Sequence, residues 1–331
     1  MRRTLKILAV LGAVGTVGTL SVPGGFDAHA QPAYPLRSVR LYVGFLPGGT
    51  TDILARMLAP TLSDAFGQPF YIDNRPGATG NIASELTAKS APDGHTLVLV
   101  AAGFASNVSL YAKPGYDPQH DFAPIGRIAA VHNVLMVHPS VPAHSARELL
   151  DLAHRYPGSL NFGSPGHGST AHLALEMLRV QAGGLNVRHV PYRGMAPAVL
   201  EVVGGHLHAL MATMPPAIVH IRSGRVRALA VASLRRAEAL PQVVTFHESG
   251  FPGFEAVGWN GLLAPAGTSY DTIVRLNLAV GGIVKSREFR ERLARLGAET
   301  LSDTPEEFTA YLRSETGKWA NLVKRSGVVM D

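Results

Sequence analysis

The stretch Phe45-Leu46-Pro47-Gly48-Gly49-Thr50-Thr51-Asp52 joins a segment with the period of a β-strand to a segment with the period of an α-helix. In residues 39–43 apolar side chains alternate with more polar ones, which is typical of a half-buried strand. In residues 53–62 the apolar side chains fall on one helical face, and Thr50, Thr51 or Asp52 is available as the N-cap. A Pro-Gly-Gly turn lets the backbone approach a ligand and leaves the first N–H groups of the helix unpaired. The stretch predicts an anion-binding turn or a plain connection between two elements.

The same order of strand, glycine-rich turn and helix occurs twice more. A short strand candidate precedes the turn 73–81, and another precedes the turn 163–170, which leads into a helix capped by Ser169 or Thr170. The continuous apolar run 97–101 is typical of a strand buried on both faces of a parallel sheet. Strands that alternate with helices indicate an α/β architecture.

Two helices have signals of their own. The helix that follows the turn 73–81 is expected to place Ile82, Ala83 and Leu86 on one side. The last helix opens with Thr304-Pro305-Glu306-Glu307, a capping box with proline at the first helical position.

Two apolar stretches divide the chain. Residues 125–137 and residues 258–265 are predicted to cross between two α/β lobes. Lobe 1 would comprise residues 31–130 plus 251–331, and lobe 2 would comprise residues 131–250. Two lobes joined by two crossing strands form a cleft that can close on a ligand by hinge motion.

Composition narrows the function classes. The 331 residues are 46% hydrophobic and 16% charged, which is typical of an ordered globular protein. The formal net charge is +6, of which residues 1–30 carry +2, and the remaining +4 is spread over single arginines without a dense basic run, so nucleic-acid binding is not supported. The chain has no cysteine, and therefore no disulfide, no thiolate metal site and no lipid-attachment residue.

Residues 1–30 have the pattern of an export signal. A basic start is followed by an apolar run over 7–22 and by Ala28-His29-Ala30, which predicts cleavage after Ala30. The apolar run is short for a bilayer span and contains several glycines, which argues against a membrane anchor. The adjacent Arg2 and Arg3 leave general secretion and the twin-arginine route both open. We expect a non-lipidated protein in the periplasm of a Gram-negative source.

Catalytic and cofactor patterns are weak. Ser169 lies in Gly-His-Gly-Ser-Thr, which differs from the Gly-x-Ser-x-Gly nucleophile elbow. The histidines at 167, 172, 206 and 208 lack the His-Glu-x-x-His spacing, and no Walker A sequence occurs. We therefore expect no metal, no cofactor and no enzymatic activity, with a secreted serine hydrolase using Ser169 and His172 as the alternative.

The three turns together supply uncharged hydrogen-bond donors. Backbone N–H groups at the helix starts, with the hydroxyls of Thr50, Thr51, Ser169 and Thr170, could hold a carboxylate without a buried arginine or lysine. For any single hydroxyl, capping its own helix is the competing interpretation.

Six motifs carry a family resemblance over essentially the whole chain after the export signal. They are Phe45 to Asp52, Asn74-Arg-Pro-Gly-Ala-x-Gly-Asn81, Ala91-Pro-Asp-Gly94, Gly166-x-Gly-Ser-Thr-x-His172, His189-Val-Pro-Tyr-Arg-Gly194 and Gly258-Trp-x-Gly-Leu-Leu-Ala-Pro265. In this order they resemble the Bug-type extracytoplasmic solute receptors of tripartite tricarboxylate transporters. The resemblance implies a type II periplasmic binding-protein fold that closes on a small carboxylate solute, the transporter's membrane subunits as partners, and no chemistry. We expect a monomer.

The resemblance also implies the ligand-binding residues. In such receptors the first Pro-Gly-Gly turn and the Ser-Thr helix start of the second lobe grip one ligand carboxylate, partly through water. Position by position this assigns Phe45, Pro47, Gly48, Gly49, Thr50 and Asp52 in the first turn, and Ser169, Thr170 and His172 in the second lobe. Asn74 and Ser106 are their expected neighbours.

One region departs from the family pattern. The family usually carries an Asp and a Phe-Asp-Asn where this chain has His208 and Met211-Ala212-Thr213-Met214-Pro215. Loss of these carboxylates removes acceptors for an amino or hydroxyl group, so we expect Thr213 at the site and a ligand that is less polar at its far end, an aromatic or simple aliphatic carboxylate. A sensor that presents its ligand-bound form to a signalling membrane partner remains a further alternative.

Overall fold

The structure, a computed structural model, describes residues 34–326, with the backbone alone over 321–326. The predicted export signal and its cleavage site after Ala30 lie outside the described residues. No helix within 34–326 has the length and apolar character needed to cross a membrane.

The first turn follows a strand in a parallel part of the sheet. Strand β1 (Val39–Val43) pairs in parallel with β2 (Phe70–Asn74) and with β3 (Thr96–Ala101), which confirms the three strands predicted here. The helices that follow these strands are α1 (Thr50–Phe66), α2 (Asn81–Ala88) after the short 3-10 helix η1 (Ala78–Gly80), and α3 (Gly103–Leu110). The sequence analysis did not predict α3 as a helix.

A second α/β unit follows. Its strands are β5 (Asn161–Ser164), β6 (Arg188–Pro191), β7 (Ala209–Thr213) and β8 (Arg227–Val231). Its helices are α4 (Ala146–Arg155), α5 (Thr170–Gln181), α6 (Met195–Val203) and α7 (Met214–Arg222). Strand β5 pairs in parallel with β6 and β7, which repeats the arrangement around β1.

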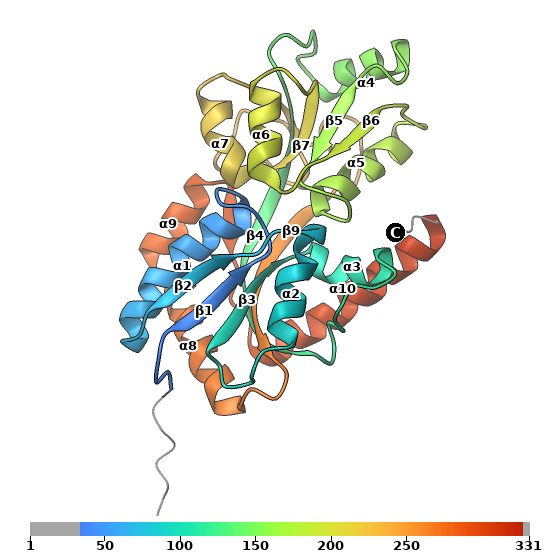
Figure 1. The fold of residues 1–331 in the computed structure, drawn as a ribbon. Helices are drawn as coiled ribbons and strands as arrows, with labels where there is room; N and C mark the ends of the chain where they lie inside the picture. The colour runs from blue at the N-terminus through green and yellow to red at the C-terminus, as the bar shows by residue number, and fades with distance from the viewer. Residues whose placement is uncertain (1–33, 327–331) are drawn as a thin grey trace, which may run out of the picture. The chain divides into compact units, whose positions relative to one another are not determined.

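Two strands connect the lobes (Figure 1). Strand β4 (Phe122–Val137) is one continuous strand that contains the predicted crossing 125–137. Its first part pairs antiparallel with β9 (Val257–Pro265), and its last part pairs with β7 and β8. The strand order is β2-β1-β3-β9-β4-β7-β5-β6, so β4 belongs to the sheets of both lobes and the predicted two-lobe α/β fold is confirmed.

The C-terminal segment returns to the first lobe. It comprises α8 (Tyr270–Lys285), α9 (Arg287–Arg295), β10 (Ala298–Thr300) and α10 (Pro305–Ser326). At the start of α10 the Thr304 amide donates to Glu307 Oε2 at 2.8 Å, and the Glu307 amide donates to Thr304 Oγ1 at 3.1 Å. These reciprocal bonds confirm the predicted capping box.

The buried side chains form separate cores. One core draws only on residues between Val134 and Phe254, and two others draw on residues up to Val131 and from Trp259 onward. The lobe boundaries at 130/131 and 250/251 remain a prediction.

The predicted apolar side of α2 is wrong in part. Ala83 is buried, but Ile82 and Leu86 are 44% and 39% exposed. The helix lies against β1, β3 and β9, and the side chains that it buries are small or polar, those of Asn81, Ala83, Ser84 and Thr87.

Candidate functional site

The first turn is held by a buried carboxylate. Gly49 is the N-cap of α1, so the predicted caps Thr50, Thr51 and Asp52 are instead the first three helical residues. Asp52 points back and accepts a hydrogen bond from the Gly48 amide at 2.9 Å. A side chain from the first turn of α1 therefore closes the glycine turn, and the Gly48 amide is used in this hydrogen bond.

Two further side chains support Asp52. Arg56 donates to both of its carboxylate oxygens, at 2.8 and 3.0 Å, and Asn74 Nδ2 donates to Asp52 Oδ1 and to the Phe45 carbonyl, each at 3.0 Å. Burial raises the pKa of Asp52, but the bonds from Arg56, Gly48 and Asn74 outweigh burial and hold the pKa below its usual value. Asp52 and Asn74 therefore lie behind the turn and fix its shape.

The second turn has an unusual backbone. Gly77, Ala78, Thr79 and Gly80 all have positive φ, and for Ala78 and Thr79 the values are 45° and 53°. A β-branched residue in this region is strained by about 1–3 kcal/mol. The strain places the Thr79 hydroxyl where it donates to the His167 carbonyl at 2.7 Å, so Thr79 connects the second turn to the third.

The third turn ends at the N-cap of α5. Ser169 Oγ accepts from the His172 amide at 3.2 Å and donates to the Gly166 carbonyl at 2.7 Å, so this hydroxyl caps its own helix. Among the hydrogen bonds of the described residues, none uses the hydroxyl of Thr170. A Cβ on Gly258 would lie 3.0 Å from Thr170 Oγ1, so the glycine on β9 gives this hydroxyl its space.

A cavity of about 50 Å³ lies where the turns meet. Its walls contain only uncharged side chains, from Phe45, Gly49, Thr50, Thr51, Thr79, Ala101, Ala102, Gly103, Val131, Pro165, Ser169, Thr170, Met195, Thr213, Gly258, Trp259 and Asn260. A single water molecule needs about 10–15 Å³ of such a cavity, so the cavity has room for a small solute.

Five helices begin at this cavity. Its walls include the N-caps of four helices, Gly49 for α1, Ala102 for α3, Ser169 for α5 and Thr213 for α7, and Met195, the first residue of α6. Each helix N-terminus carries a partial positive charge and unpaired N–H groups, but Pro215 and Pro216 in the first turn of α7 and Pro197 in that of α6 have no N–H to donate. The cavity therefore favours an anion although no cationic side chain lines it.

Hydroxyl groups around the cavity are oriented by their partners. Asn260 Nδ2 donates to Thr51 Oγ1 and to the Val100 carbonyl, each at 3.1 Å, which leaves the Thr51 proton free to donate. Thr50 Oγ1 and Thr213 Oγ1 lie 2.6 Å apart and join α1 to the start of α7.

The structure separates the predicted site residues into two groups. Those that line the cavity are Phe45, Gly49, Thr50, Ser169, Thr170 and Thr213, and those that do not are Pro47, Gly48, Asp52, Asn74, Ser106 and His172. Pro47 is exposed, and Gly48 borders a separate groove beside α6 and α7. Ser106 Oγ donates to the Gly168 carbonyl at 3.0 Å, which ties α3 to the third turn.

Several lining residues were missed by the sequence analysis. Thr79 lies in the turn 73–81 and Asn260 in the stretch 258–265. The sequence analysis singled out both segments, so these two residues could have been found from them. Met195 and Val131 carried no signal, because only the folded chain brings α6 and β4 to the cavity.

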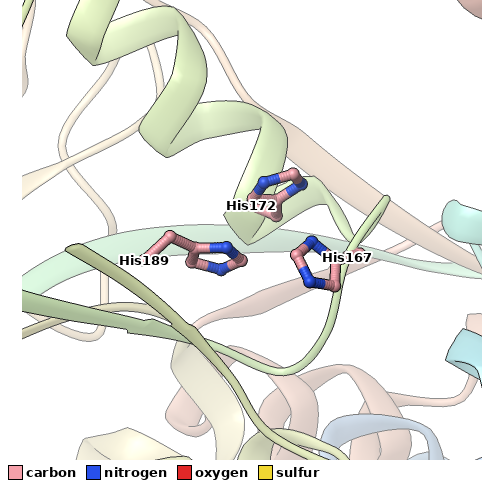
Figure 2. Close-up of side chains that lie close together, drawn as sticks. All are labelled: His167, His172 and His189. Atoms are coloured by element: carbon pink, nitrogen blue, oxygen red, sulfur yellow. The ribbon is translucent and has the colours of Figure 1, made fainter. Parts of the chain in front are cut away.

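Three histidines gather behind the third turn (Figure 2). His167 lies in the turn, His172 in α5 and His189 in β6, and one ring nitrogen of each lies within 4.8 Å of the others. Burial lowers the pKa of all three, to about 4 for His172 and about 3 for His189. The sequence analysis considered His167 and His172 as possible metal ligands, but it named His189 only as part of a family motif.

The geometry around Ser169 gives the hydrolase alternative no support. Ser169 Oγ donates to a carbonyl, while His172 Nδ1 accepts from the Gly168 amide at 3.2 Å. A serine nucleophile needs its hydroxyl bonded to a general base, and no such bond joins these two side chains in the described part of the chain.

Comparison with known proteins gives consistent matches. Residues 54–328 match the model of the tripartite tricarboxylate transporter family receptor. The chain is 36% identical to Protein BugT of Bordetella pertussis over 97% of this chain and 98% of that protein. The structure is similar to that of the periplasmic binding protein BugD, with a TM-score of 0.86 and 34% identity, covering 90% of this chain and all of BugD. It is equally similar to R. palustris Rpa4515 with adipate, with a TM-score of 0.86 and 35% identity over 89% of this chain and 99% of that one.

Proposed function

The chain belongs to the tripartite tricarboxylate transporter receptor family, and we propose that it captures a small carboxylate solute between its two lobes and delivers it to the membrane subunits of a tripartite transporter. As in the family, the protein would act in the periplasm, as a monomer, and without chemistry on its ligand. The solute class and the delivery step are the parts of this proposal that need a test.

The convergence of five helix N-termini on one uncharged cavity carries the proposal. A carboxylate there would accept hydrogen bonds from helix-start amides and from the hydroxyls of Thr51 and Thr170, without the desolvation penalty of a buried cationic partner. The adipate in the Rpa4515 structure shows that this related protein binds a carboxylate, which supports the same class here.

The cavity also favours one ligand class within the carboxylates. No carboxylate side chain lines it, so the cationic amino group of an amino acid would be buried without a partner. Apolar walls from Val131, Met195 and Trp259 suit a hydrocarbon chain, and about 50 Å³ favours a short aliphatic carboxylate over an aromatic one. A longer ligand requires the lobes to move apart.

Several hydrogen bonds join the lobes directly. They run from Thr50 to Thr213, from Thr79 to the His167 carbonyl and from Ser106 to the Gly168 carbonyl. A ligand that bridges the same turns would add to these contacts and shift the molecule toward closure, which is the form a transporter could recognise.

Calorimetric titration tests the solute class. We expect short aliphatic carboxylates to bind more tightly than benzoate, citrate or amino acids. Tight binding only to an amino acid or to citrate would contradict the proposed ligand class. Transport of the selected solute by vesicles that contain the cognate membrane subunits, with and without this protein, tests delivery separately.

A further inference from the structure

The cluster of His167, His172 and His189 is arranged like an incomplete metal site. The rings of His172 and His189 are stacked with centroids 4.3 Å apart, and the His167 ring stands edge-on to both, at 5.3 and 5.0 Å. Figure 2 shows the three side chains converging from the third turn, α5 and β6. No other group of three or more potential ligands was found within the described residues.

One atom of the cluster lacks a partner. His167 Nδ1 is buried and makes no hydrogen bond among the described residues. A buried polar atom without a partner is costly, whether it carries a proton or a lone pair. A metal ion bound at this nitrogen would satisfy it.

The other two rings each have one nitrogen engaged. His189 Nε2 lies 2.7 Å from Ser164 Oγ, which leaves Nδ1 available. A metal-binding histidine usually donates its second ring N–H to a neighbour, and His189 fits that pattern, whereas His172 Nδ1 accepts from the Gly168 amide.

We infer that His167, His172 and His189 form a binding site for a divalent transition-metal ion of the Zn²⁺ and Cu²⁺ class. Three imidazoles with an open fourth position suit these ions. Glu176 Oε1 lies 3.8 Å from His172 Nε2, and Arg179 donates to the same carboxylate at 3.0 Å, so the two charges beside the site largely balance. His167, His189 and Glu176 are partly exposed, so an ion can reach the cluster from solvent.

Binding requires a small contraction. Nitrogens bound to a tetrahedral ion at about 2.0–2.1 Å lie about 3.4 Å from one another. In the present structure the three ring nitrogens lie up to 4.8 Å apart. This contraction would fall on the side chains, because the hydroxyls of Thr79 and Ser106 hold the carbonyls of His167 and Gly168 in place.

Metal binding would also change the third turn. A neutral imidazole carries one proton, and His172 Nδ1 accepts from the Gly168 amide, so its proton is on Nε2. Ligation through Nδ1 replaces that acceptor, and ligation through Nε2 moves the proton onto Nδ1, facing the amide. In both cases the Gly168 amide loses its hydrogen-bond acceptor. The carbonyl of the same residue accepts from Ser106 Oγ, so the change falls on the contact between α3 and the third turn.

Zn²⁺ and Co²⁺ titrations of untagged protein, stripped with a chelator and kept in a buffer without carboxylates, test the inference. We expect one equivalent of Zn²⁺, a visible Co²⁺ spectrum of the tetrahedral type, and faster exchange of the Gly168 amide in the metal-bound protein. His167→Ala should weaken Zn²⁺ binding by at least about 100-fold, because loss of a ligand costs more than the 10–100-fold loss of its hydrogen-bond partner. The control His120→Ala alters an exposed histidine beside Asp117 and should bind as the wild type does.

His167→Gln provides a second variant if His167→Ala does not fold. Binding of less than half an equivalent by the wild type, or equal affinity of the wild type and the folded His167 variant, would overturn the site. Because these titrations contain no carboxylate solute, their outcome is independent of the proposed transport function.

Discussion

The first turn, residues 45–52, and the third turn, residues 163–170, bring helix N-termini to the same cavity but rest on different chemistry. Behind the first turn lies an ionised group, Asp52, with Arg56 and Asn74 bonded to it. Behind the third turn lie His172 and His189, which are neutral and stacked. A glycine turn that leads into a helix N-terminus can therefore be supported by a charged side chain or by neutral ones.

This difference predicts different sensitivities. The first turn needs its carboxylate ionised, because Asp52 accepts charge-assisted bonds from the Gly48 amide and from Asn74, and Asn74 in turn donates to the Phe45 carbonyl. The third turn needs its histidines unprotonated, because protonation would place charge in a buried stack. Each turn can be weakened by a change that leaves the other intact.

Acidification should give the largest effect, and at the third turn first. Unfolded histidine takes up a proton near pH 6.5, whereas His172 and His189 do so near 4 and 3 in the folded chain. Their contribution to stability is fully present above pH 6.5 and is lost as the pH falls toward the folded values, by about 1.4 kcal/mol per pH unit for each ring. Glu176, which favours a charged His172, and Arg179, which opposes charge on both rings, are the nearest charged groups.

Urea unfolding in the presence of a chelator, at pH values from 7 to 4.5, measures this loss. His189→Gln should reduce the slope of unfolding free energy against pH, and His120→Gln, at an exposed histidine, should leave it unchanged. If the wild type and both variants showed the same slope of unfolding free energy against pH, the proposed difference between the two turns would be wrong. The contribution of Asp52 is fully present at neutral pH and is lost only below the pKa of an unfolded aspartate, about 3.9, because the pKa of Asp52 is depressed in the folded chain.

Removal of the Asp52 carboxylate should give the next largest effect. Asp52→Ala leaves the Gly48 amide and Asn74 Nδ2 without this acceptor, and we expect a loss of about 3 kcal/mol of unfolding free energy at neutral pH. Asp64→Ala, on the exposed side of the same helix, is the matched control and should change stability by less than about 0.5 kcal/mol. Similar stability of the two variants would show that Asp52 does not hold the first turn.

Thr170→Val should reduce affinity with little change in stability. The Thr170 hydroxyl lines the cavity and has no partner among the described residues, so a carboxylate ligand would lose one charge-assisted bond, about 1.5–3 kcal/mol of binding free energy. Thr309→Val on the exposed face of α10 is the control, and calorimetry with the best short carboxylate is the measurement. Unchanged affinity would remove Thr170 from the proposed site.

Ser169→Ala should give the smallest effect, and mainly on folding. Its hydroxyl caps α5, and loss of an N-cap costs about 1 kcal/mol. Urea unfolding and calorimetry of the same variant separate the two roles. A loss of affinity larger than that of Thr170→Val, at unchanged stability, would make Ser169 the principal ligand contact.

The sequence by itself determined the local structure of this protein. Strand periods, glycine turns and the capping box at Thr304 act over a few residues, so β1, β2, β3, the start of α10 and the two-lobe α/β class could be predicted from them, whereas α3 was not. It also identified the glycine-rich turns that meet at the cavity, because their backbone geometry depends on glycine. The predicted N-caps of α1 failed because Thr50, Thr51 and Asp52 each have a partner elsewhere in the molecule or in the turn.

Only the tertiary structure decided which side chains face the cavity and which lie behind it. Asp52 and Thr50 are two residues apart, yet Asp52 turns toward Arg56 and Asn74 while Thr50 reaches Thr213. The convergence of five helix starts and the meeting of three histidines depend on packing between segments far apart in the sequence. Sequence periodicity carries no information about such distances, because the contacts form only when β4 and β9 bring the two lobes together.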